Sequence, residues 1–77
     1  LIISGIRTEQ CCETTARVAS DLGYAVDFVS EATLTFPMTH QSTGQTFSAQ
    51  DITTRTELVL AGRFARIVNV DTCLSSL

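Results

Sequence analysis

Residues 5–16 read Gly5-Ile6-Arg7-Thr8-Glu9-Gln10-Cys11-Cys12-Glu13-Thr14-Thr15-Ala16 and follow directly on the apolar run Leu1-Ile2-Ile3. The apolar run is typical of a short buried strand, and a helical pattern begins within the quoted stretch. Cys11 is therefore expected where a buried strand gives way to the N-terminus of a helix. The backbone N–H groups and the dipole at such an end stabilise a thiolate. This placement makes Cys11 a candidate nucleophile.

One helix and one further strand are expected directly after the cysteine. Apolar and small residues recur at helical spacing and share one helix face: Cys11, Thr15, Val18, Ala19 and Leu22. Gly23 follows at the usual position of a helix-ending glycine. Residues 24–29 then form an apolar strand in which Asp27 is the only charged residue. Strand, helix and strand within so few residues predict a parallel pair of strands with a right-handed crossover.

A second helix and a third strand are expected after a long polar loop over residues 30–47. Ser48 and Asp51 resemble a capping box at the start of the helix. A mostly apolar strand follows over residues 64–70, and Asp71 is expected to cap a last helical turn. This order of elements predicts an α/β fold, a three-layer α/β/α sandwich with a parallel sheet.

The size and composition of the chain limit what it does alone. It has 77 residues, of which 44% are hydrophobic and 17% charged, with a net charge of −3. This acidity argues against a nucleic-acid partner, and no apolar run is long enough for a membrane span. All 5 basic residues are arginines, so lysine chemistry has to come from another segment. Because the chain begins with Leu1 in a buried strand, it is expected to be part of a larger unit.

The quoted stretch also carries a family resemblance. The spacing Gly-x-x-Thr-x-x-Cys-x-x-x-Thr-Ala, then Gly23-Tyr24-x-Val26 and Glu31-Ala32, resembles the isochorismatase-like cysteine hydrolases. This family includes nicotinamidases, N-carbamoylsarcosine amidases and ureidoacrylate hydrolases. The similarity covers residues 1 to about 36 closely, and the later elements fit the C-terminal end of the family's domain. The resemblance therefore implies that residues 1–77 are the C-terminal part of a single isochorismatase-like hydrolase domain. Two positions depart from the family pattern, Cys12 after the nucleophile and Glu31 before the alanine.

The resemblance implies a mechanism and a site. Cys11 matches the nucleophile, and the backbone N–H groups of Arg7 and Cys11 match the oxyanion hole. The Ile6–Arg7 peptide bond matches a position that is cis in the family. The catalytic Asp and Lys belong to the N-terminal part of the same domain, which is therefore an expected partner. The Asp would take the thiol proton, the thiolate would attack an amide or ureido carbonyl, and water would release the thioester.

Other side chains support no further site. Cys12 and Cys73 are expected to pack, and His40 is expected to lie in a loop or an interface. With one histidine, no metal site or cofactor is expected, and the residues that bind the small-molecule substrate stay unassigned. A cytoplasmic location is expected, because the three cysteines do not look like a disulfide framework. The resemblance implies a homo-oligomer, since members of the family commonly assemble as dimers or larger. A non-catalytic binding or assembly module is the alternative, and a nucleotide-binding half-domain is weaker because Gly5 stands alone.

Overall fold

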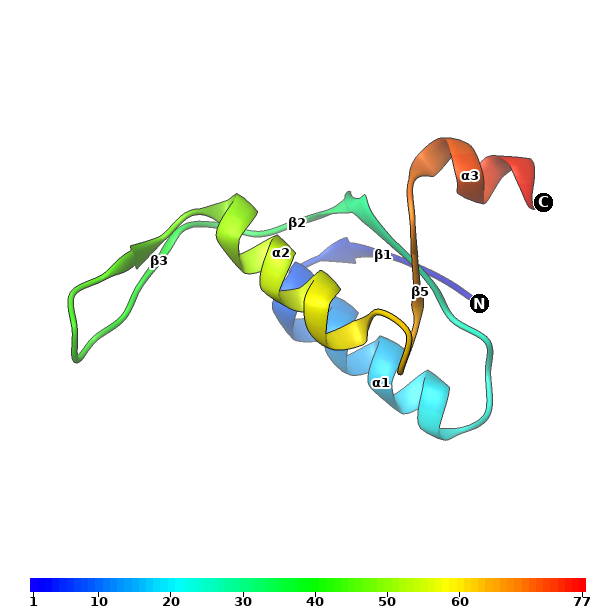
Figure 1. The fold of residues 1–77 in the computed structure, drawn as a ribbon, viewed down its shortest axis with the longest axis horizontal. Coiled ribbons are helices and arrows are strands. Elements are labelled where there is room, and N and C mark those ends of the chain that lie inside the picture. Colours follow the sequence, from blue (N-terminus) through cyan, green and yellow to red (C-terminus); the bar gives the residue numbers. More distant parts are fainter.

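The computed structural model describes residues 1–77 and places three strands in one parallel sheet (Figure 1). The strands are β1 (Ile2–Ile6), β2 (Asp27–Leu34) and β5 (Arg66–Val68), in the order β1-β2-β5. Both neighbouring pairs run parallel, with Ile3 beside Phe28 and Phe28 beside Ile67. The α/β class with a parallel sheet is therefore confirmed. Because β1 stands at one end of this order, its outer edge is unpaired.

Helices cover both faces of the sheet (Figure 1). A π-helical turn, η1 (Thr8–Cys12), leads into α1 (Glu13–Asp21), which lies beside α2 (Ala49–Leu60), while α3 (Val70–Ser75) contacts β2. Successive side chains of a strand point to opposite faces, so Phe28 and Val29 enter different cores. The larger core comprises Ile3, Cys12, Ala16, Ala19, Val26, Phe28, Leu60 and Ala65, and the smaller one Val29, Val68 and Cys73. Two cores on two faces of the sheet give the predicted three layers. None of the helices has the length and apolar character that a membrane span needs.

The buried face of the first helix is not the predicted one. Its buried apolar residues are Cys12, Ala16 and Ala19. Of the residues predicted to form the buried helix face, only Ala19 is among them, whereas Val18 and Leu22 are exposed. Small side chains let the helix approach the sheet closely, so they form the inner face and exclude the larger ones. Val18 and Leu22 instead line a shallow groove together with Leu1 and Tyr24.

The segment predicted as a loop over residues 30–47 is partly regular structure. β2 continues to Leu34, and Thr33 and Leu34 pair with the end of β1 after a shift in register between Ile3 and Gly5. Beyond β2, the strands β3 (Met38–Thr39) and β4 (Thr46–Phe47) form an antiparallel hairpin. The prediction missed both features. Residues 32–36 do alternate between apolar and polar side chains. The structure, however, buries Thr33 and exposes Leu34, and the two strands of the hairpin are too short to show a period. His40 lies in the hairpin turn, where its Nδ1 accepts hydrogen bonds from the backbone N–H groups of Ser42 and Thr43.

Side-chain caps mark the first residues of the two helices that follow the hairpin. The capping box of α2 is confirmed: the Ser48 hydroxyl accepts from the Asp51 N–H at 3.0 Å, and the Asp51 carboxylate accepts from the Ser48 N–H at 3.1 Å. The cap of α3 is Asn69, whose Oδ1 accepts from the Thr72 N–H at 2.7 Å, and not Asp71 as predicted. Asp71 lies one residue inside the helix, where its charge favours the positive end of the dipole.

Candidate active site

The chain turns sharply between the end of β1 and η1. Gly5 has a φ of +125°, in a region that L side chains rarely adopt, which explains why the motif needs glycine here. The peptide bond between Ile6 and Arg7 is cis, as the resemblance implied. η1 begins directly after this bond with Thr8 and ends with Cys12. The turn therefore places the two cysteines at the carboxyl end of a parallel strand, the edge at which open α/β sheets bind ligands.

Cys11 is exposed and Cys12 is buried. The Cys11 side chain lines a groove of about 290 Å³ together with Thr15 of α1 and with residues of β1, Gly5 and Ile6 among them. Since β1 is the edge strand, this groove lies on the side of the sheet that no strand of this chain covers. The geometry thus presents one thiol to a site that another segment can complete.

One backbone N–H just before η1 has no acceptor within the chain. The Arg7 N–H makes no hydrogen bond within the chain, whereas the Arg7 carbonyl accepts from the N–H groups of Gln10 and Cys12, both at 3.2 Å. The peptide is thus held through its oxygen while its N–H stays available. A free backbone N–H can stabilise an oxyanion that forms within hydrogen-bond distance of it.

Buried hydroxyl groups attach η1 to β2. Thr8 is fully buried, and its hydroxyl donates to the Thr33 hydroxyl at 2.7 Å. The Thr33 hydroxyl in turn donates to the carbonyl of Ser30 at 2.6 Å. The hydroxyl of Thr35 donates to Oε1 of Glu9 at 2.7 Å. These contacts fix the turn that carries Cys11, and hydropathy patterns do not reveal them because the residues are polar.

A buried carboxylate joins α1 to α2. Oε1 of Glu13 accepts hydrogen bonds from Nη1 of Arg55 at 2.5 Å and from the Thr56 hydroxyl at 3.0 Å. Oε2 accepts from Nε of Arg17 at 3.2 Å. Glu13 is therefore a satisfied structural charge, placed two residues after Cys11. The Arg55 guanidinium is likewise paired through this carboxylate.

Comparison with known proteins identifies the domain to which this turn belongs. A family model described as Isochorismatase domain matches residues 1–57. The chain belongs to the isochorismatase family. No curated protein matches it.

Three solved structures resemble this isochorismatase-family chain. One, described as a hydrolase of the family from Chromobacterium violaceum, has a TM-score of 0.91 and 28% identity over 99% of this chain. An isochorismatase-like protein from Burkholderia xenovorans has a TM-score of 0.87 and 29% identity over 99% of this chain. An isochorismatase hydrolase homologue from Oleispira antarctica has a TM-score of 0.90 and 25% identity over 97% of this chain. The chain spans only 39%, 36% and 39% of the length of these proteins.

Of the other two cysteines and the histidine of this isochorismatase-family chain, only Cys12 also borders the Cys11 groove, and it is almost fully buried there. Burial raises the pKa of the Cys12 thiol, and the neighbouring Cys11 and Glu9 raise it further. Cys12 is thus held as a neutral thiol and packs in the core, as predicted. Cys73 packs against β2 and β5 in the smaller core, also as predicted. His40, in the hairpin turn, is not among the residues that line the groove.

Proposed function

We propose that this isochorismatase-family chain carries the nucleophile of a cysteine hydrolase that cleaves a C–N bond in a small amide or ureido substrate. The observation that carries the proposal is the exposed Cys11 thiol in η1, which lies in the sequence between the buried hydrogen bonds of Thr8 and Glu13. The free Arg7 N–H supports it as one donor of an oxyanion hole, with the Cys11 N–H as the second.

The proposed reaction has two halves. In the first, a carboxylate takes the proton of Cys11, the sulfur attacks the carbonyl carbon, and the oxyanion accepts hydrogen bonds from the Arg7 and Cys11 N–H groups. The C–N bond then breaks, and the nitrogen leaves with that proton. In the second half, water adds to the thioester, the C–S bond breaks, and the products are a carboxylic acid and the free thiol.

We propose that the N-terminal part of the same domain supplies the carboxylate and the family's lysine. Two features support this, because surfaces of both kinds are normally covered. One is the exposed apolar groove of Leu1, Val18, Leu22 and Tyr24, and the other is the unpaired edge of β1. A homo-oligomer in a reducing cytoplasm is part of the same proposal, and three unpaired cysteines fit that compartment.

The test is hydrolysis of a panel of small amides and ureido compounds by the complete protein that contains this chain. We expect Cys11→Ala to lower kcat/KM by about 1,000-fold or more, because covalent catalysis is lost. The matched control is Cys12→Ala, which removes the adjacent buried thiol and should keep activity within about tenfold if the protein folds. Full activity in Cys11→Ala would contradict the proposal.

The second candidate is a non-catalytic binding or assembly module. It is favoured by one observation, that none of the basic residues in this chain is a lysine. A complete protein whose remaining segment also lacks the Asp and the Lys, and which hydrolyses no member of the panel, would establish this alternative.

A further inference from the structure

The Arg7 side chain lies outside the groove that contains Cys11. Ile6, the preceding residue, lines this groove, whereas Arg7 does not. The Arg7 guanidinium instead lies over the Phe36 ring, with its carbon 5.1 Å from the ring centroid. Strand pairing accounts for this contact, because Ile6 of β1 is the partner of Leu34 at the end of β2. The residues that follow the two strands are therefore neighbours in space.

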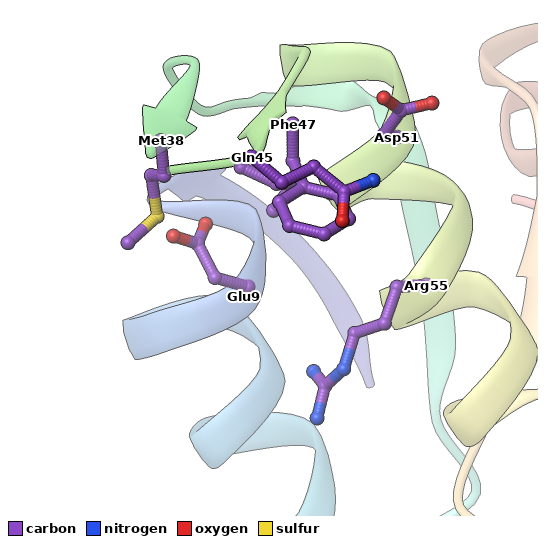
Figure 2. A pocket seen from close by; sticks show the side chains of 7 residues that line it. Glu9, Met38, Gln45, Phe47, Asp51 and Arg55 are labelled. Atoms are coloured by element: carbon purple, nitrogen blue, oxygen red, sulfur yellow. The ribbon is translucent and has the colours of Figure 1, made fainter. Parts of the chain in front are cut away.

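Glu9 is the second group that holds the Arg7 guanidinium. Its Oε2 lies 4.0 Å from Nε of Arg7, and the Glu9 side chain is only 13% exposed. Its other oxygen accepts a hydrogen bond from the Thr35 hydroxyl at 2.7 Å. Figure 2 shows Glu9 on η1 with Met38 of the β3–β4 hairpin nearby. The ring and the carboxylate that contact Arg7 thus both depend on residues 35 and 36, directly after β2.

The pair of Arg7 and Glu9 has no other partner at its facing atoms. Nε of Arg7 and Oε2 of Glu9 are both buried, and neither makes a hydrogen bond. Because the two charges offset each other and the guanidinium does not line the Cys11 groove, Arg7 is poorly placed to bind an anionic group of a substrate. Loss of either the ring or the carboxylate would leave the guanidinium free to turn toward water.

The side-chain contacts of Arg7 also restrain the direction of its N–H. The Arg7 carbonyl accepts from the N–H groups of Gln10 and Cys12, which restrains the Cα–C bond of Arg7. The contacts with Phe36 and Glu9 restrain its Cα–Cβ bond. Since the bonds at a tetrahedral carbon keep set angles, two restrained bonds also restrain the third, Cα–N. The Arg7 N–H, which has no acceptor within the chain, is thereby held in one direction.

We propose that Phe36 and Glu9 are positioning residues, which act through the Arg7 side chain to hold the Arg7 N–H in the direction of the oxyanion. The inference rests on the proposed function, in which this N–H is one donor of the oxyanion hole. A hydrogen bond weakens steeply as its distance and angle depart from the optimum, so a donor that swings away stabilises the oxyanion less.

The experiment compares variants of the complete protein that all keep the Arg7 N–H. Arg7→Ala and Phe36→Ala each remove one side of the contact between guanidinium and ring. For the panel amide that is hydrolysed fastest, each should lower kcat about tenfold and change KM by less than about twofold. Phe36→Tyr keeps the ring face and should restore kcat. The matched control is Arg63→Ala, which removes a guanidinium 5.0 Å from the Phe64 ring, outside the Cys11 groove, and should leave kcat unchanged.

Two further measurements separate positioning from a general loss of structure. An aldehyde with the acyl group of the same amide binds as the Cys11 thiol adds across its C=O bond, which places a tetrahedral oxygen where the oxyanion forms. Its affinity should fall in the two alanine variants by about the same factor as kcat. Iodoacetamide forms no oxyanion, because the Cys11 sulfur displaces iodide from a saturated carbon. Its rate of alkylation should therefore stay within about twofold.

Unchanged kcat and aldehyde affinity in both alanine variants would overturn the proposal. An alkylation rate that falls as much as kcat would also overturn it, since the thiol itself would then have moved. A rise in KM alone would assign Arg7 to substrate contact instead. Full activity in Cys11→Ala would remove the proposed function and this inference together, whereas turnover that needs Cys11 but not the Arg7 side chain overturns this inference alone.

Discussion

The two sides of η1 differ although they carry adjacent residues. On one side Thr8, Cys12 and the following Glu13 are buried, packed or hydrogen-bonded to β2 and α2. On the other side Cys11 is exposed in a groove beside the unpaired edge of β1. The difference shows that buried packing and hydrogen bonds on the inner side of η1 hold the exposed Cys11 thiol of the outer side in place. Preorganisation of this kind is what a nucleophile needs.

The largest expected difference between the two sides is in thiol reactivity. At pH 7.5, iodoacetamide should alkylate Cys11 about 100-fold faster or more than Cys12, because only Cys11 is accessible. Since the pKa of Cys12 is raised above its ordinary value of 9.0, its thiolate fraction at neutral pH is lower still and increases only as the pH rises past that value. Peptide mass spectrometry after timed quenching measures both rates. Equal rates would show that the two sides are not distinct.

The next largest effect concerns the buried carboxylate. Glu13→Ala should lower the free energy of unfolding by about 2 kcal/mol, since the buried Thr56 hydroxyl loses its acceptor while the half-exposed Arg17 and Arg55 regain water. Urea unfolding of the complete protein measures this. The control is Asp21→Ala on the exposed end of α1, which should change stability by less than about 0.5 kcal/mol. A loss in Glu13→Ala no larger than in the control would contradict the role of Glu13.

A smaller effect is expected at the hydroxyl pair under the turn. Thr8→Val should destabilise by about 1 kcal/mol, because it replaces one buried hydroxyl of the pair with a methyl group. Thr8→Ser keeps the hydroxyl and should retain most of the stability and the alkylation rate of Cys11. If Thr8→Val alkylates at Cys11 as wild type does, the hydroxyl pair does not position the thiol.

The smallest effect is expected at the exposed ion pair between β2 and β5. Nε and Nη2 of Arg66 donate to the two carboxylate oxygens of Asp27 at 3.0 and 3.2 Å. The hydrogen bond from Arg66 lowers the pKa of Asp27 below its ordinary value of 3.8, so the pair stabilises the fold above that value. The contribution is lost as the pH falls through the lowered pKa. Asp27→Asn should thus lower Tm slightly near pH 7, and the difference should vanish in strong acid; a difference that grows in acid would contradict this sign.

Much of the fold could be predicted from local patterns. The strand–helix–strand unit and the capping box at Ser48 each depend on residues close in sequence, which is why they were predicted correctly. The buried face of α1 was predicted wrongly because hydrophobic periodicity takes no account of side-chain size. It favours the larger, more apolar Val18, whereas the structure buries the small Ala16. The short hairpin gave no periodic signal at all.

The site could be predicted only in part, for a different reason. Gly5 and Cys11 belong to one short motif, so their positions at the end of β1 followed from the sequence. The contacts that fix the turn link Thr8 to Thr33 and Glu13 to Thr56, over long sequence separations. No composition or spacing rule connects such polar residues before the chain is folded.

The most direct measurement is a rapid-quench experiment in which the complete protein reacts with an amide that it hydrolyses. Acid stops the reaction, trypsin digests the protein, and mass spectrometry analyses the peptides. Cleavage after Arg7 and Arg17 gives one peptide that contains both adjacent cysteines, and fragmentation separates them. The account predicts a transient acyl group on Cys11 that forms and decays with turnover. Complete turnover with Cys11 unmodified throughout, or an acyl group on Cys12, would contradict it.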